Sequence, residues 1–300
     1  MKRFLVLLVV VSMIVACPAY AFGASSVSTM TAQTEMVTSE DDRWDVRIES
    51  GEAEYGYDTI QGACSYRGYA YMALYNRTVE RIKIAKVNLS TMKVEKVSAP
   101  LAATVHGNTL TYNTRSNIIV AVCGQKDAKR IAIVNPNTLT VMKTQKINIS
   151  RKRLGEKYTG INGLAYNAQK NVYILKVRNK SGRVVILNSK FKVKKVVKPK
   201  KMIKSLLAQG IYSEGKYMYD IQSFRGKNYY NLISVRKISN GKIVKRIVVP
   251  SGRVGELFEL ESLFHEGGKW YICMYRADVK PTGDADRKNY LFEIKNMPKF

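Results

Sequence analysis

A segment that recurs five times constrains the fold of this chain more than any other feature of the sequence. Each copy begins with a polar residue, then a small or hydroxyl-bearing residue, then an apolar one, and successive copies start 47, 54, 47 and 52 residues apart. Units of this length bury their apolar faces only by packing against the next unit. The five copies begin at Gln61, Asn108, Asn162, Gln209 and Glu261.

Each copy continues with short runs rich in β-branched and aromatic residues, separated by turn-forming residues. Four such runs at a period near 50 residues are typical of a β-propeller blade. We therefore predict an all-β, five-bladed propeller with four strands per blade and blades starting near residues 59, 106, 160, 207 and 259. The 46% hydrophobic content excludes a disordered chain, which could not form such a core.

The fifth copy ends after its third strand, at residues 294–300, and would leave an exposed sheet edge. The segment Trp44–Ile48 alternates apolar and polar residues, and it precedes the first blade without belonging to one. We expect it to pair with the last blade and close the ring, which makes residues 43–300 one domain. Residues 22–42 are then a disordered leader. The alternative is that all of 22–58 is a disordered acidic leader.

The first 21 residues indicate export. Lys2 and Arg3 precede an apolar run over Phe4–Val15, and Ala19-Tyr20-Ala21 supplies small residues for cleavage. This pattern is typical of a signal peptide, and the run is too short for a comfortable membrane span, so no transmembrane segment is expected. The alternative is a lipoprotein, because Ile14-Val15-Ala16-Cys17 fits a lipobox and would place the lipid on Cys17.

Two copies carry a further pattern, an aliphatic strand followed by an Asn-containing turn, a Thr and another strand, at residues 84–94 and 131–141. This pattern resembles the repeat of YVTN-type bacterial surface propellers. With Gly163-Leu-Ala-Tyr-Asn167, the unit is also similar to secreted propellers of unassigned function in clostridia-like Gram-positive bacteria. The resemblance covers residues 59–298 and is weaker in the last two blades. It implies extracellular binding or display more often than catalysis.

The repeat alignment places one polar residue per blade on the first strand, in a ring near the mouth of the central channel. Such a ring binds water and satisfies itself, or it binds a small ligand. A calcium ion would be held weakly, because the ring offers one carboxylate; no other cofactor and no metal-ligand cluster is expected. The ring consists of Gln61, Asn108, Asn162, Gln209 and Glu261.

The second interpretation is an enzyme with its site at the channel, either a carbohydrate-active enzyme (a glycoside hydrolase or lyase) or a glutaminyl-cyclase-like enzyme. Five-bladed propellers include glycoside hydrolases and glutaminyl cyclases, and both use acidic residues around the channel. A glycosidase needs two carboxylates that flank the scissile bond. The residues available for this role are Glu261, with Glu259, Asp220 and His106 as neighbours, but none lies in a motif of either class. Catalysis is therefore the less favoured interpretation.

The net charge of +27 points to an anionic partner or to solubility alone. Loops that join strands two and three and loops that join blades share one face of a propeller, and these loops are basic; we expect this channel-mouth face to bind the partner. For an exported protein the expected partner is an anionic wall polymer or glycan, bound by a monomer; export argues against nucleic acid. The candidate polyanion-binding residues are Arg151, Lys152, Arg153, Lys200, Lys201 and Lys204.

The cysteines of the exported chain, Cys64, Cys123 and Cys273, lie at unrelated spacings inside apolar runs. An odd number excludes complete internal pairing. We expect all three to be buried and reduced.

Overall fold

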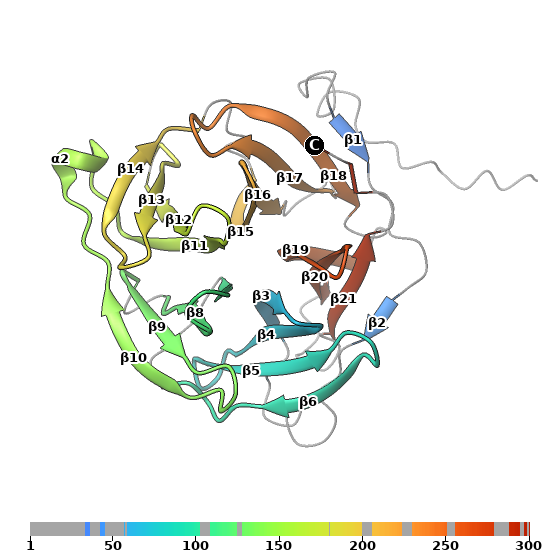
Figure 1. Ribbon diagram of the computed structural model, residues 1–300. Coiled ribbons are helices and arrows are strands. Elements are labelled where there is room, and N and C mark those ends of the chain that lie inside the picture. The colour runs from blue at the N-terminus through green and yellow to red at the C-terminus, as the bar shows by residue number, and fades with distance from the viewer. Residues whose placement is uncertain are drawn as a thin grey trace, which may run out of the picture.

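A computed structural model of the chain shows five antiparallel sheets in a ring around a central axis (Figure 1). Four of the sheets have four strands, and the fifth has five because a short N-terminal strand joins it; the prediction of a five-bladed β-propeller with four-stranded blades is confirmed. The structure describes residues 34–36, 43–45, 57, 59–102, 109–124, 128–179, 181–199, 206–223, 230–250, 256–278, 288–294, 297–298 and 300. The signal peptide and lipobox predicted for residues 1–21 lie outside this part of the chain.

The first three blades are complete four-stranded sheets built from consecutive strands. In each of them the first strand lies nearest the axis and the fourth lies on the outer rim (Figure 1). Their strands are β3 (Thr59–Tyr66), β4 (Tyr69–Asn76), β5 (Arg81–Asn88) and β6 (Lys93–Val97); β7 (Leu110–Asn113), β8 (Ile118–Val122), β9 (Arg130–Val134) and β10 (Val141–Lys146); and β11 (Gly160–Asn167), β12 (Val172–Arg178), β13 (Val184–Asn188) and β14 (Val193–Val197).

Two short N-terminal strands, β1 (Thr34–Met36) and β2 (Arg43–Asp45), join the sheets of the last two blades. Strand β2 pairs antiparallel with β21 and supplies the missing fourth strand, so the predicted closure of the last blade is confirmed. Strand β1 pairs in parallel with β18, the outer strand of blade 4. This strand lies within residues 22–42, for which the sequence predicted a disordered leader. The other strands of blade 4 are β15 (Leu207–Glu214), β16 (Tyr217–Ser223), β17 (Tyr230–Lys237) and β18 (Ile243–Pro250). Those of blade 5 are β19 (Glu256–Glu266), β20 (Lys269–Asp278) and β21 (Lys288–Ile294).

The hydrophobic core is divided among the spaces between neighbouring blades. One cluster joins Tyr71 and Ile84 of blade 1 to Ile119 of blade 2, and similar clusters join each further pair of blades around the ring. Alternate residues of the strands therefore face opposite neighbours, and both faces of the inner strands are apolar. Burying apolar surface between sheets makes every blade depend on its two neighbours.

The three predicted cysteines behave as small buried hydrophobic residues. Cys64, Cys123 and Cys273 are all reduced and buried in the clusters between blades. This confirms the expectation from the sequence.

Candidate functional site

The longest repeat interval, 54 residues between Asn108 and Asn162, contains a short helix that the other described blade connections lack. This helix, α2 (Arg151–Leu154), lies on the outer rim beside β14 (Figure 1). Ser150 caps its N-terminus by accepting a hydrogen bond from the Arg153 backbone N–H at 3.3 Å, and Gly155 ends it with a left-handed φ of 79°. Buried Leu154 anchors the helix to the core.

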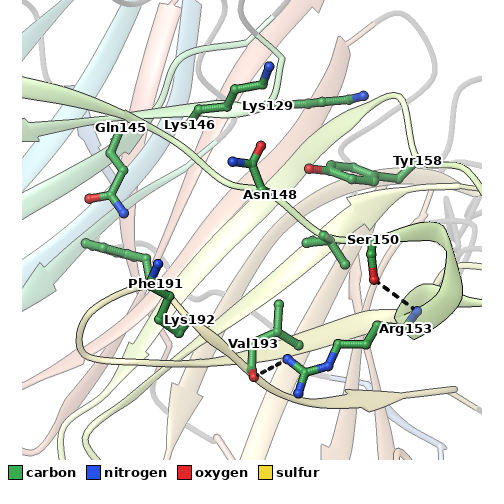
Figure 2. Close-up of a pocket in the computed structure, with 11 residues that line it drawn as sticks. Lys129, Gln145, Lys146, Asn148, Ser150, Arg153, Tyr158, Phe191, Lys192 and Val193 are labelled. Atoms are coloured by element: carbon green, nitrogen blue, oxygen red, sulfur yellow. Dashed lines mark hydrogen bonds between the residues drawn. The ribbon is translucent and has the colours of Figure 1, made fainter.

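A crevice of 570 Å³ lies between this connection, the end of β10 and the turn that follows β13 (Figure 2). Four of its lining side chains are cations and none is a carboxylate. Lys129 and Lys146 come from blade 2, Lys192 comes from blade 3, and Arg153 comes from α2. The other lining residues are Gln145, Asn148, Ile149, Ser150, Tyr158, Phe191 and Val193.

Two of the four cations are held in place by neighbouring groups. The Arg153 Nη1 donates a hydrogen bond of 2.7 Å to the Val193 carbonyl, which ties α2 to blade 3 (Figure 2). The Lys129 Nζ lies 4.7 Å from the centre of the Tyr158 ring, and the Tyr158 hydroxyl donates to the Ile147 carbonyl. Lys146 and Lys192 are exposed. The crevice thus has two cations held by neighbouring groups and two exposed lysines at its edge.

The link between blades 2 and 3 differs from the links that join two other pairs of blades. Lys96 of β6 donates to the Asn137 carbonyl at 2.6 Å, and Lys195 of β14 donates to the Ser239 carbonyl at 2.7 Å. Each of these bonds joins an outer strand to a turn of the next blade. Between blades 2 and 3, Arg153 of the extra connection makes the corresponding contact, and the space beneath it remains open.

Cations gathered without a carboxylate repel one another, and an anion in the crevice would relieve that repulsion. The guanidinium of Arg153 and the ammonium groups of Lys129, Lys146 and Lys192 match the oxygens of a phosphate or carboxylate. Asn148 and Ser150 add neutral hydrogen-bonding groups to the same wall. The site therefore suits a repeating anionic polymer better than a small neutral ligand.

The sequence-predicted polyanion residues fall in two groups. Arg151, Lys152 and Arg153 lie on α2 at the rim, and Arg151 and Lys152 are exposed next to the crevice. This position is at the edge of the propeller and not on the channel-mouth face predicted from the sequence. Lys200, Lys201 and Lys204 lie outside the described residues.

The predicted ring residues occupy equivalent positions on the first strands. Register shifts occur between residues 60 and 62, 161 and 163, 208 and 211, and 260 and 262, so each shift contains one ring residue. Gln61, Gln209 and Glu261 are buried, Asn162 is half-buried, and Asn108 lies outside the described residues.

The ring side chains bond to groups of their own surroundings. The Gln61 Nε2 donates to the Ile60 carbonyl at 3.2 Å, and Asn162 accepts from the Arg178 Nε at 3.0 Å. Gln209 donates to Glu259 at 2.5 Å. Glu261 lies near Cys273, whose thiol has a pKa raised by burial and, to a lesser extent, by this carboxylate. The side chains of Gln61, Asn162 and Gln209 thus have hydrogen-bond partners within the protein.

The first strands of neighbouring blades approach one another closely at glycines next to this ring. A Cβ on Gly62 would lie 2.7 Å from Thr109 Cα, and one on Gly210 would lie 2.7 Å from the Glu261 carbonyl oxygen. Only glycine permits backbones this close. The ring residues therefore lie where neighbouring first strands are in close contact.

The carboxylates proposed for an enzyme lie in buried networks between blades. Glu259 accepts hydrogen bonds from Gln209, from the Ser223 hydroxyl at 3.1 Å and from the Tyr275 hydroxyl. Asp220 lies 2.5 Å from Lys176 and 3.6 Å from Arg236. The fourth proposed residue, His106, lies outside the described residues. These networks link blades 3, 4 and 5 near the axis.

Among the described residues, no three His, Cys, Asp or Glu side chains gather in a way that would hold a metal ion. Within the same part of the chain, no helix is long and apolar enough to cross a membrane.

Solved structures support the fold. The chain is similar to the tail fiber of Staphylococcus aureus phage P68, with 13% identity and a TM-score of 0.57 over 79% of this chain and 50% of that chain. It is also similar to an exo-β-1,3-galactanase of Phanerochaete chrysosporium, with 10% identity and a TM-score of 0.52 over 77% of this chain and 59% of that one. This chain thus spans between half and two thirds of the length of these proteins. At such identities the likeness shows a β-propeller and nothing finer.

No family model matches the sequence, and no curated protein matches it. The resemblance to YVTN-type repeats and to clostridial propellers therefore stays a prediction.

Proposed function

We propose that this protein is an exported, non-catalytic binding propeller that holds an anionic cell-wall polymer in the rim crevice between blades 2 and 3. The observation that carries the proposal is the set of four cations, Lys129, Lys146, Arg153 and Lys192, around one cavity whose lining has no carboxylate. The exposed Arg151 and Lys152 extend the same positive surface along α2.

The chemistry of the outside of a bacterial cell supports this choice of partner. Export is predicted from the leader, and the polyanions abundant at a Gram-positive wall are polymers that carry phosphate or carboxylate groups. A lysine or arginine near an anionic surface contributes about 1 kcal/mol, so four to six of them together retain a protein strongly at low salt. The net charge of +27 adds a long-range attraction of the same sign.

The position of the crevice also suits a polymer. Its lining residues come from α2, the end of β10 and the turn before β14, which lie on the outer rim (Figure 1), where a long chain can pass without entering the central channel. The similarity to a phage tail fiber supports only the fold, because the identity is 13%.

A retention experiment tests the proposal. Purified protein is mixed with purified wall teichoic acid immobilised on beads, and the bound fraction is measured as salt rises. The Debye length falls from about 10 Å at 0.1 M to a few Å near 0.5 M, so a partner held by charge should be released over this range. Retention that is unchanged at about 0.5 M salt would contradict binding by the cationic crevice.

A further inference from the structure

Two adjoining hollows lie on the face of the propeller where tight turns join the first and second strands of each blade. A cavity of 290 Å³ at the axis is lined by first-strand residues of all five blades, including Tyr66, Tyr112, Tyr166 and Tyr212. A groove of 860 Å³ continues from it over the turns of blades 3, 4 and 5. Both hollows are lined by Gln169, Glu214, Gly215 and His265.

The groove presents several aromatic rings to solvent. Trp270 and Tyr217 are half-buried, and Phe300 is 40% exposed. Trp270 stacks on His265 with ring centres 4.6 Å apart and planes at 14°, and Tyr217 lies 5.7 Å from Phe300. These ring contacts orient the aromatic side chains, so their exposed faces and edges form a preorganised apolar surface for a ligand.

Polar groups sit at the junction between the cavity and the groove. The His265 Nδ1 lies 3.1 Å from the Glu214 Oε1, and this pair joins blade 5 to blade 4. The side chain of Glu214 is 41% exposed and that of His265 is 27% exposed, so both keep hydrogen-bonding capacity toward a ligand. Gln169 adds an amide at the same place.

The charges around the two hollows balance. Three carboxylates and three lysines line them together, in contrast to the four cations of the rim crevice. A strongly charged ligand would therefore gain little here. The charged lining residues are Glu214, Glu266, Glu293, Lys170, Lys216 and Lys269.

We propose that these hollows form a second binding site, which takes the end of a neutral oligosaccharide. A sugar ring has apolar C–H faces and a rim of hydroxyl groups, which need aromatic surfaces beside carboxylate and amide groups. The axial cavity is near the lower end of the usual size of small-molecule sites, about 300 to 1,000 Å³, and suits one terminal sugar ring. The next rings lie along the groove past Trp270 and Tyr217. This site is independent of the rim crevice and of the function proposed for it.

Tryptophan fluorescence provides the test, because the chain has two tryptophans and Trp270 lines the groove. In a Trp44→Phe variant of the full chain the emission comes from Trp270 alone. We titrate it with neutral tetrasaccharides of glucose, galactose, mannose and N-acetylglucosamine, and we expect saturable change with at least one. Calorimetry on the unmodified full chain with the same sugars repeats the test without substituting a tryptophan.

A matched pair of variants locates the binding. Glu214→Gln keeps the shape of the side chain but removes its charge, and it should weaken sugar binding about tenfold, as expected for the loss of a charge-assisted hydrogen bond. Glu95→Gln on the exposed outer strand β6 should leave the affinity unchanged. The proposal is overturned if none of the four sugars binds at up to about 10 mM in calorimetry. It is also overturned if the two variants bind equally well.

Discussion

The Lys176 Nζ lies 2.5 Å from the Asp220 Oδ1, and this buried ion pair joins β12 of blade 3 to β16 of blade 4. The same ammonium group donates to the carbonyl oxygens of Gln209 and Ile221, at 3.1 and 3.0 Å. The lysine thus combines one ion pair with two backbone hydrogen bonds, all to blade 4. Blade 4 also contributes Arg236, whose pKa is lowered by burial while Asp220 offsets part of that effect.

Replacing Lys176 by methionine should destabilise the fold strongly. The substitution keeps the length of the side chain but leaves Asp220 buried without its nearest cation, and breaking a buried pair in this way costs about 3–5 kcal/mol. Urea unfolding followed by circular dichroism measures the loss. Lys170→Met, at an exposed turn position, is the control and should change the free energy of unfolding by less than about 0.5 kcal/mol. Equal stability of the two variants would show that the pair contributes nothing.

Alkaline pH should destabilise the protein through its buried tyrosines. Burial raises the pKa of Tyr112 and of Tyr173 to about 12. In the unfolded chain these phenols lose their protons near pH 10, so between these values the unfolded state binds fewer protons than the folded state. The free energy of unfolding therefore falls as the pH rises from about 10 to about 12.

Urea unfolding at several pH values, combined with tyrosinate absorbance, measures this dependence. Tyr112→Phe removes one of the groups, and its stability should fall less steeply over the same pH range. A free energy of unfolding that stays constant up to pH 12 would contradict the burial of these hydroxyls.

The closely packed glycines of the first strands should tolerate alanine to different degrees. In Gly62→Ala the new Cβ would meet the backbone of Thr109 at 2.7 Å, and a backbone cannot rotate away. In Gly163→Ala the nearest atom is Ile211 Cγ2 at 3.1 Å, which belongs to a side chain that can adjust. We expect a loss of about 1–3 kcal/mol for Gly62→Ala and a smaller loss for Gly163→Ala. The thermal unfolding midpoints of the two variants are compared. A smaller loss of stability for Gly62→Ala than for Gly163→Ala would contradict the close approach of Gly62 to the backbone of Thr109.

The two N-terminal strands should contribute unequally to stability. Strand β2 completes blade 5, whereas β1 adds an extra strand to a blade that already has four. A chain that begins at residue 40 loses β1 only, and one that begins at residue 50 loses both. We expect the larger fall in the midpoint of urea unfolding between these two chains, because an open blade leaves β21 as an unpaired edge. Equal midpoints would contradict closure by β2.

The repeat made the architecture predictable from the sequence. The five starts at Gln61, Asn108, Asn162, Gln209 and Glu261 gave the number of blades, and the missing fourth strand of the last blade indicated closure by residues near Trp44. The buried cysteines followed from their apolar surroundings.

The candidate sites were harder to predict, because they join residues of different blades. Lys146 and Lys192 belong to one crevice only because the end of β10 lies beside the turn after β13 in the ring. The signal that could have found this crevice is the 54-residue interval, which is the longest of the four and contains the residues of α2. The groove near Trp270 has no comparable signal, because its aromatic residues come from separate blades and from the segment after β21.

The central claim is that the rim crevice binds an anionic wall polymer. Two double variants with the same change in net charge test it most directly: Lys146→Glu with Lys192→Glu in the crevice, and Lys93→Glu with Lys242→Glu at exposed positions of blades 1 and 4. Their affinities for purified wall teichoic acid are measured at constant low salt. The crevice variant should bind at least tenfold more weakly than the control variant, since two local charges of about 1 kcal/mol each are reversed. Equal affinities would show that net charge alone attracts the polymer, and the claim would be wrong.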